Sequence, residues 1–166
     1  MKWSKLKDRI EEQFADSVRG HAAIHITRYG PGLSSAMTRG WLTWDGEEVL
    51  NFSTINWLKA AHEIQNTSGS TFDATRDYLH EQGDYSRFDF TDALEEYLSL
   101  SIGSALQSNN MLIRALAMLD RRVGKRRLKG LQFDTTEYPL VKQLYTLRCA
   151  AEGILPTDTA ASGNKL

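Results

Sequence analysis

The sequence predicts an α+β fold, with an N-terminal helix, a three-stranded antiparallel meander and a helical C-terminal half. Between residues 21 and 53 apolar and polar residues alternate with the two-residue period of strands. The pair Asp45-Gly46 separates two β-prone runs there, which is the strongest short-range signal for a hairpin. After residue 53 the apolar residues recur every three or four positions, as they do in helices.

The first elements follow from spacing. Trp3, Leu6, Ile10 and Phe14 share one face of a helix predicted over 4–17 and should dock it on the sheet. A strand is predicted over 21–29, and the hairpin pairs the runs 39–45 and 47–53. The helical half is predicted to hold helices at 54–65, 73–82, 91–106, 111–122 and 140–151, with a loop at 66–70 and an irregular stretch at 84–90.

Composition indicates an ordinary globular protein. With 166 residues, of which 41% are hydrophobic and 25% charged, the chain is predicted to form one domain over 1–155 with a flexible tail at 156–166. No apolar run follows the basic start, and no window approaches the roughly 18 apolar residues that a membrane span needs. Cys149 has no internal partner and is predicted to be a buried thiol. These features predict a cytoplasmic protein that does not act in a membrane.

The net charge of −1 hides two opposed blocks. Residues 58–100 carry three basic and nine acidic side chains, whereas residues 101–130 carry seven basic and one acidic. Within the second block lies a basic run of six cations in nine positions, namely Arg121, Arg122, Lys125, Arg126, Arg127 and Lys129. Three interpretations stay open: binding of a polyanion or an acidic partner, stabilisation of a helix C-terminus, or pairing with the acidic block of the same molecule.

The acidic block ends in a cluster of four carboxylates at a predicted helix start, namely Asp89, Asp92, Glu95 and Glu96. Acidic residues in a first turn complement the helix dipole. The same cluster could face a basic protein partner. Paired carboxylates can also catalyse hydrolysis, but such a role needs a cleft and shifted pKa values that a sequence does not reveal.

No motif predicts a metal, a cofactor or a catalytic site. His21, His25, His62 and His80 lack the ligand spacing of zinc sites. His21 and His25 share a strand face and could bind a metal with a third group, but they are interpreted as exposed strand histidines. No phosphate-binding loop and no nucleophile elbow is present in the sequence. Trp41 and Trp44 should face opposite sides of their strand, and both are expected to pack in the core.

Two C-terminal stretches, LDRRVGKRRLKG at 119–130 and YPLVKQLYTLRCAAEG at 138–153, resemble a family of small uncharacterised bacterial proteins. The opening KWSKLKDRIEEQFA and the WDGEE hairpin resemble the same family. Members of that family are sometimes encoded beside contact-dependent or polymorphic toxin genes, so the resemblance implies an immunity role. It implies no catalytic residue.

The sequence therefore predicts a binding protein that is not an enzyme. The expected partner is a protein, for which the resemblance suggests a toxin domain, and the ten residues of the basic run and the acidic cluster are the expected partner-binding residues. The alternative is a nucleic-acid-associated protein that uses residues 121–129.

Overall fold

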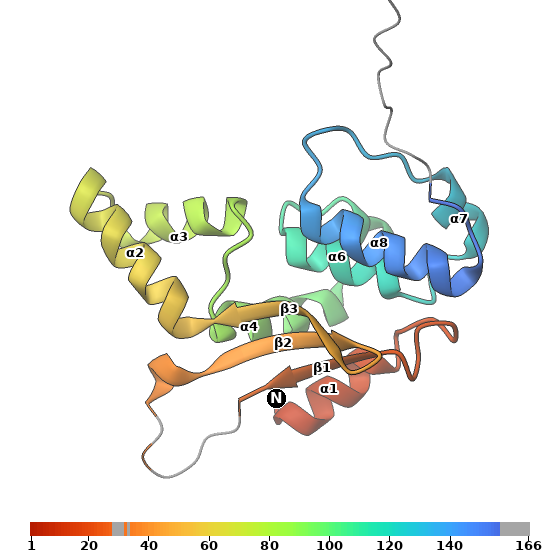
Figure 1. Ribbon diagram of the computed structural model, residues 1–166, viewed down its shortest axis with the longest axis horizontal. Coiled ribbons are helices and arrows are strands. Elements are labelled where there is room, and N and C mark those ends of the chain that lie inside the picture. Colours follow the sequence, from red (N-terminus) through yellow and green to blue (C-terminus); the bar gives the residue numbers. More distant parts are fainter. Residues whose placement is uncertain (28–31, 33, 157–166) are drawn as a thin grey trace, which may run out of the picture.

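The predicted α+β architecture is confirmed by the computed structural model, which describes residues 1–27, 32 and 34–156 (Figure 1). Helix α1 (Trp3–Glu11) precedes strand β1 (Ala22–Ile26), a short 3-10 helix η1 (Ser35–Met37) and strands β2 (Arg39–Trp44) and β3 (Glu47–Ser53). The remaining described residues form helices α2 (Thr54–Ser68), α3 (Phe72–Glu81), α4 (Arg87–Ser99), α5 (Ile102–Leu106), α6 (Met111–Leu119), α7 (Lys125–Gly130) and α8 (Pro139–Glu152).

The sheet is the predicted meander, with antiparallel strands in the order β1-β2-β3. Asp45 and Gly46 both have positive φ, at 51° and 84°, as the tight turn between β2 and β3 requires. Strand β1 is an edge strand whose outer backbone groups are covered by α1. Glu11 accepts a hydrogen bond from the Ile24 N–H, and Lys7 donates to the Ile24 carbonyl at 2.7 Å. These contacts remove an edge to which another strand could pair.

One face of the sheet carries the core. Ile24, Leu42 and Phe52 are buried there, and the ring of Phe52 lies 5.3 Å from that of Phe90 in α4. A side chain at Gly40 would overlap the Phe90 ring, so glycine allows α4 to approach the sheet. Beyond α4, the paired helices α6 and α8 complete the core (Figure 1).

Helices α2 and α3 form a hairpin that extends from this body (Figure 1). The hairpin has a small core of its own, formed by Trp57, Ala61 and Leu79. Gly69, at φ 67°, ends α2 in the left-handed conformation that glycine adopts without strain. The Thr71 hydroxyl then accepts a hydrogen bond from the Ala74 N–H and caps the start of α3.

Several predicted boundaries are wrong. Helix α1 ends at Glu11 rather than 17, because residues 13–15 bond to residues 119–121 instead of continuing the helix. Helix α2 runs through most of the loop predicted at 66–70, and α4 begins within the stretch 84–90 that was predicted to be irregular. The predicted helix 91–106 is broken after Ser99, and the predicted helix 111–122 ends at Leu119. Residues 28–29 of the predicted strand and 157–166 of the predicted tail lie outside the described residues.

Candidate functional site

The two C-terminal stretches that carry the resemblance meet in space around two buried polar residues. Asp120 is fully buried at the end of α6, where it accepts a hydrogen bond from the Tyr97 hydroxyl and pairs with Arg122 at 2.8 Å. Burial and the neighbouring Asp120 raise the pKa of Tyr97, and the hydrogen bonds to Asp120 raise the pKa of Arg122. Arg121 and Arg122, the first two residues of the basic run, therefore differ. Arg122 is held in this buried network by Asp120, whereas Arg121 is not.

Arg148 of α8 forms hydrogen bonds with the backbone of the turn between α6 and α7. This residue is 2% exposed, and its guanidinium donates hydrogen bonds to the carbonyls of Asp120 and Val123, both at 3.2 Å. It also pairs with Glu152 at 2.9 Å, and Glu152 in turn pairs with Lys125 at 3.1 Å. Burial alone would raise the pKa of Glu152, but hydrogen bonds from Ser17 and Lys125 and the charge of Arg148 lower it. These contacts fix the backbone from which the basic run projects.

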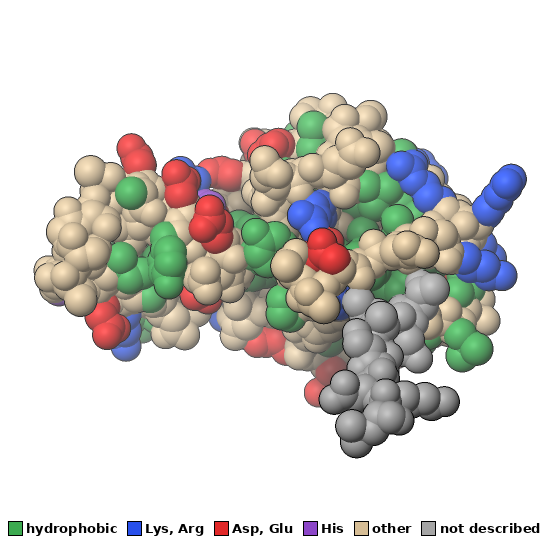
Figure 2. Space-filling view, turned by 90° about the horizontal axis from the view of Figure 1, so that it is seen from above, with side chains coloured by type: hydrophobic (Ala, Val, Ile, Leu, Met, Phe, Trp, Pro, Cys, Tyr) green, Lys and Arg blue, Asp and Glu red, His purple; other side chains and the backbone are tan. Residues whose placement is uncertain are grey.

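The remaining cations of the run form the basic surface, which we define as Arg121, Arg126, Arg127 and Lys129. All four are exposed, and none forms a salt bridge with a described residue. Helix α7 is anchored by Leu128, which is fully buried and points away from these cations. Figure 2 shows Lys and Arg side chains gathered at this end of the molecule.

The hypothesis that the basic run pairs with the acidic block is not supported by the described residues, in which no salt bridge joins the run to residues 73–96. Helix-end stabilisation does not account for the whole run either. Arg127 and Lys129 do lie in the last turn of α7, where cations favour the helix C-terminus, but Arg121 lies in the turn after α6 and Arg126 near the start of α7.

The acidic cluster is also divided. Asp89 is buried at 7% exposure, where it forms a capping box with Ser86 and pairs with Arg76 at 2.7 Å. Glu95 pairs with the N-terminal amine of Met1 at 3.0 Å. Asp92 and Glu96 are exposed and have no salt bridge within the described part of the chain. Asp89 is therefore a structural residue, and the partner-binding role predicted for it does not fit its burial.

The pKa of Asp89 predicts a pH-dependent contribution to stability. Burial alone would raise this pKa, but the His80 imidazole 3.4 Å away and the hydrogen bonds from Ser86 outweigh burial and hold it well below its ordinary value. A depressed folded-state pKa stabilises the fold above the unfolded value of about 3.9, and this stabilisation is lost as the pH falls. We expect Asp89→Asn to lower the free energy of unfolding at pH 7, and we expect the deficit to shrink by pH 3.

Denaturant melts of both proteins at pH 7, 5 and 3 measure this deficit. Asp77→Asn is the matched control, because Asp77 is an exposed acid of the neighbouring helix α3. A deficit for Asp89→Asn that stays constant from pH 7 to pH 3 would contradict the assignment.

The outer face of the sheet is occupied by contacts within the molecule. The Trp41 ring stacks on His25 at 5.1 Å, and the Arg39 guanidinium lies 4.2 Å from the centre of the same ring. The expectation that both tryptophans pack in the core is wrong for Trp41, whereas Trp44 does pack against the core. Burial lowers the pKa of His25.

The expectation of a buried Cys149 thiol is confirmed, since Cys149 is fully buried and burial raises its pKa. In the described ranges no group of three His, Cys, Asp or Glu side chains is arranged to hold a metal ion. Across those same residues, no helix has both the length and the apolar character needed to cross a membrane.

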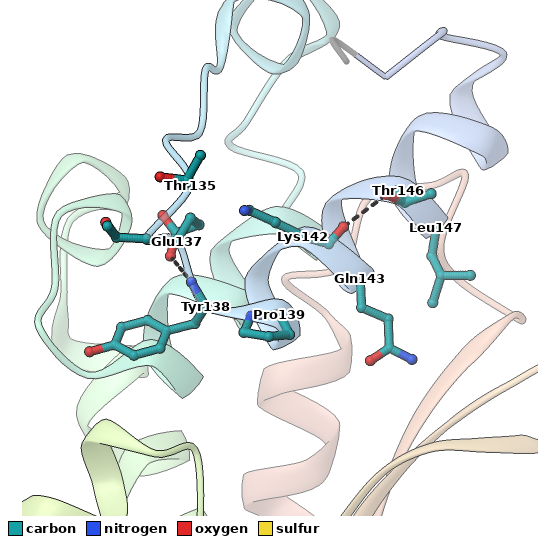
Figure 3. A pocket seen from close by; sticks show the side chains of 9 residues that line it. Thr135, Glu137, Tyr138, Pro139, Lys142, Gln143, Thr146 and Leu147 are labelled. Carbon is teal, nitrogen blue, oxygen red and sulfur yellow. Dashed lines mark hydrogen bonds between the residues drawn. The ribbon is translucent and has the colours of Figure 1, made fainter. Parts of the chain in front are cut away.

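Two pockets lie on either side of Tyr138, just before α8, and no sequence motif predicted either of them. The larger, of about 650 Å³, is bounded by Thr135, Tyr138, Lys142 and Leu147 at the start of α8 (Figure 3). None of the ten predicted partner-binding residues lines it.

The second of these pockets, of about 530 Å³, lies beside Tyr85, Asn110 and Arg114. These polar groups already have partners, because the Tyr85 hydroxyl donates to Asn110 at 3.2 Å and Arg114 pairs with Glu137 outside the lining. Burial raises the pKa of Tyr85 to about 12.

A third hollow, the apolar groove, lies where η1, α2, α3 and α4 meet and has a volume of about 340 Å³. Its lining includes the apolar side chains Leu58, Phe72 and Phe88 and the charged side chains Arg76, Asp89 and Asp92. Two of the predicted acidic residues thus belong to one concave site. Sequence reasoning missed its apolar members, because Leu58 fits helical periodicity as well as a core residue does and Phe72 precedes the helix predicted at 73–82.

One family model matches the chain, that of the SF0329 protein family, over residues 2–149. The matched region includes all of α7 and most of α8, and with them Asp120 and Arg148. No curated protein and no solved structure matches the chain. Because the family model covers most of the 166 residues, the chain belongs to the SF0329 protein family.

Proposed function

We propose that this protein is a non-catalytic cytoplasmic binding protein that holds an acidic surface of a protein partner against its basic surface. The observation that carries the proposal is the state of Arg121, Arg126, Arg127 and Lys129. These four cations are exposed and lack salt bridges to described residues, although the chain has 21 acidic residues against 20 Lys and Arg. Exposed cations without an acidic partner among the described residues are available to complement an acidic surface of another protein.

The basic surface is well prepared for binding because its backbone is held by the core. Leu128 is buried beneath α7, and the Tyr145 hydroxyl donates a hydrogen bond to the Leu128 carbonyl at 3.4 Å. Lys125, in the first turn of α7, forms a salt bridge with Glu152 of α8. A partner therefore orders only side chains when it binds, and this lowers the entropic cost of association.

The absence of catalysis is part of the proposal. Its support is that the charged groups with displaced pKa values already have partners within the chain. Asp89 bonds to Arg76 and Ser86, and Glu152 bonds to Arg148 and Lys125. Groups used in this way contribute to stability, whereas a general acid or base needs access to a substrate.

An immunity-type role is the concrete form of this proposal, with a toxin domain as the partner. Its support is the resemblance to a family whose members are sometimes encoded beside toxin genes. An immunity protein acts by occluding its target, and a rigid charged surface that needs no chemistry suits that role.

Nucleic acid is the alternative partner, since the same exposed cations suit phosphates. Base-stacking aromatics are the feature that single-strand binders add. Phe133, the aromatic nearest in sequence, packs its ring on Tyr145 with the centres 4.8 Å apart. The net charge of −1 also provides no long-range attraction to a polyanion. Both facts favour a protein partner.

The test compares Arg126→Ala/Arg127→Ala with the wild type in affinity capture from the native lysate, with and without nuclease. Lys5→Ala/Lys59→Ala is the matched control, because it removes two exposed cations elsewhere. We expect a protein that is captured by the wild type and by the control, is lost with the double variant, and resists nuclease. Both double variants should unfold within about 0.5 kcal/mol of the wild type, because the replaced side chains are exposed.

Binding to generic RNA at physiological salt provides the opposing outcome. If the wild type binds such RNA with a steep salt dependence, and the Arg126→Ala/Arg127→Ala variant does not, then the nucleic-acid alternative is correct. Capture that is abolished by nuclease leads to the same conclusion.

A further inference from the structure

The apolar groove at the other end of the molecule gathers large hydrophobic side chains that the fold leaves in water. Leu58, Phe72 and Phe88 line it and are 42%, 53% and 41% exposed. Met37 of η1, next to the lining residue Ala36, is more exposed still. Single apolar residues scattered on a surface need no explanation, but a contiguous group around a hollow marks a site of interaction.

These side chains are held in place before any partner arrives. Phe72 lies at the start of α3, edge-on to the buried Trp57 with the ring centres 5.7 Å apart. Phe88 lies in the first turn of α4, with the Arg87 guanidinium 5.1 Å from the centre of its ring. Aromatic side chains fixed in this way suit an interface because little rotamer entropy is lost when they are covered.

The charged residues of the groove indicate which sign of charge its partner carries. Both carboxylate oxygens of Asp89 already accept hydrogen bonds, one from Arg76 and the other from Ser86. The Arg76–Asp89 pair is therefore neutral as a unit. Asp92 is exposed in the lining and has no salt bridge to a described residue, so it is the one uncompensated charge there. An unpaired carboxylate beside apolar anchors complements a cation that lies next to apolar side chains.

We propose that the apolar groove docks an amphipathic segment of a protein partner, whose apolar side chains cover Leu58, Phe72 and Phe88 and whose Lys or Arg pairs with Asp92. The walls of the groove are helices, so a helical segment laid between them is the geometry that fits. The groove lies at the end of the molecule that α2 and α3 form, whereas α7, which carries most of the basic surface, lies at the opposite end (Figure 1). The proposal does not rest on the function assigned to that surface.

The experiment uses the full chain and two defined probes. One is a fluorescein-labelled 14-residue amphipathic helix of Leu and Lys, and the other has the same pattern with Glu in place of Lys. Fluorescence anisotropy gives the affinity of each. Phe72→Ser and Leu58→Ser remove anchors of the groove, and Asp92→Lys reverses its charge. Tyr78→Ser and Glu96→Lys are the matched controls, since both residues are exposed and lie outside the groove on the same helices.

We expect the Leu/Lys probe to bind the wild type and to lose about tenfold in affinity with Phe72→Ser or Leu58→Ser, as an interface anchor does. Asp92→Lys should weaken binding at least about threefold, which corresponds to the modest energy of an exposed pair. Tyr78→Ser and Glu96→Lys should stay within about twofold, in line with the small contribution of residues outside an interface core. The Leu/Glu probe should bind more weakly than the Leu/Lys probe.

Three results would overturn the proposal. The first is no binding of the Leu/Lys probe, and the second is equal loss of binding in the groove variants and their controls. The third is dimerisation of the wild type, seen by light scattering and abolished by Phe72→Ser, because the groove would then be covered by a second copy. If the capture experiment shows that the basic surface binds no protein, the results expected for the groove do not change.

Discussion

Replacing Arg148 with methionine is expected to lower the free energy of unfolding by about 3–5 kcal/mol, the range found when one partner of a buried ion pair is removed. Methionine has a similar length and no donors. The buried carbonyls of Asp120 and Val123 would therefore each lose a hydrogen bond, and Glu152 would lose its 2.9 Å partner. Guanidinium melts followed by circular dichroism measure the change.

Arg121→Met is the control for this prediction, because it makes the same substitution at an exposed position of the turn that Arg148 supports. Its expected effect is within about 0.5 kcal/mol. A double-mutant cycle with Glu152→Gln then separates the ion pair from the carbonyl contacts. If Arg148→Met costs less than about 1 kcal/mol, the buried arginine does not hold the two C-terminal stretches together.

Replacing Phe14 with alanine is expected to cost about 3–5 kcal/mol, as for a fully buried aromatic side chain. Phe14 is 2% exposed, and its backbone forms an isolated antiparallel bridge with Asp120. The substitution opens a cavity beneath the point where the N-terminal segment meets the end of α6. The change in stability is measured by chemical denaturation.

Phe72→Ala is the matched control for Phe14→Ala, because it deletes the same atoms from a side chain that is 53% exposed. Its cost should be several-fold smaller than that of Phe14→Ala, since little buried surface is lost. Comparable losses in the two variants would mean that the N-terminal segment does not pack as described.

The strands and the fold class were predictable because their signals are local. The turn at Asp45-Gly46 needs positive φ at both positions, and few residue pairs allow it. The start of α4 was predictable in principle from Ser86 and Asp89, which have the spacing of a capping box. The end of α1 was not, because residues 13–15 leave the helix to bond with residues more than one hundred positions away.

The sequence by itself determined the meander, the helical second half and the separation of an acidic from a basic block. These features depend on short-range periodicity and composition, which are the same however the elements are arranged in space. Only the tertiary structure decided which charges of the two blocks are available to a partner. Arg122 pairs with Asp120, and Lys125 pairs with Glu152. Asp89 is buried in the capping box of α4, whereas Arg126 and Arg127 are exposed. A charged side chain meets its partner through space, and α8 brings Glu152 to Lys125 only when the chain is folded.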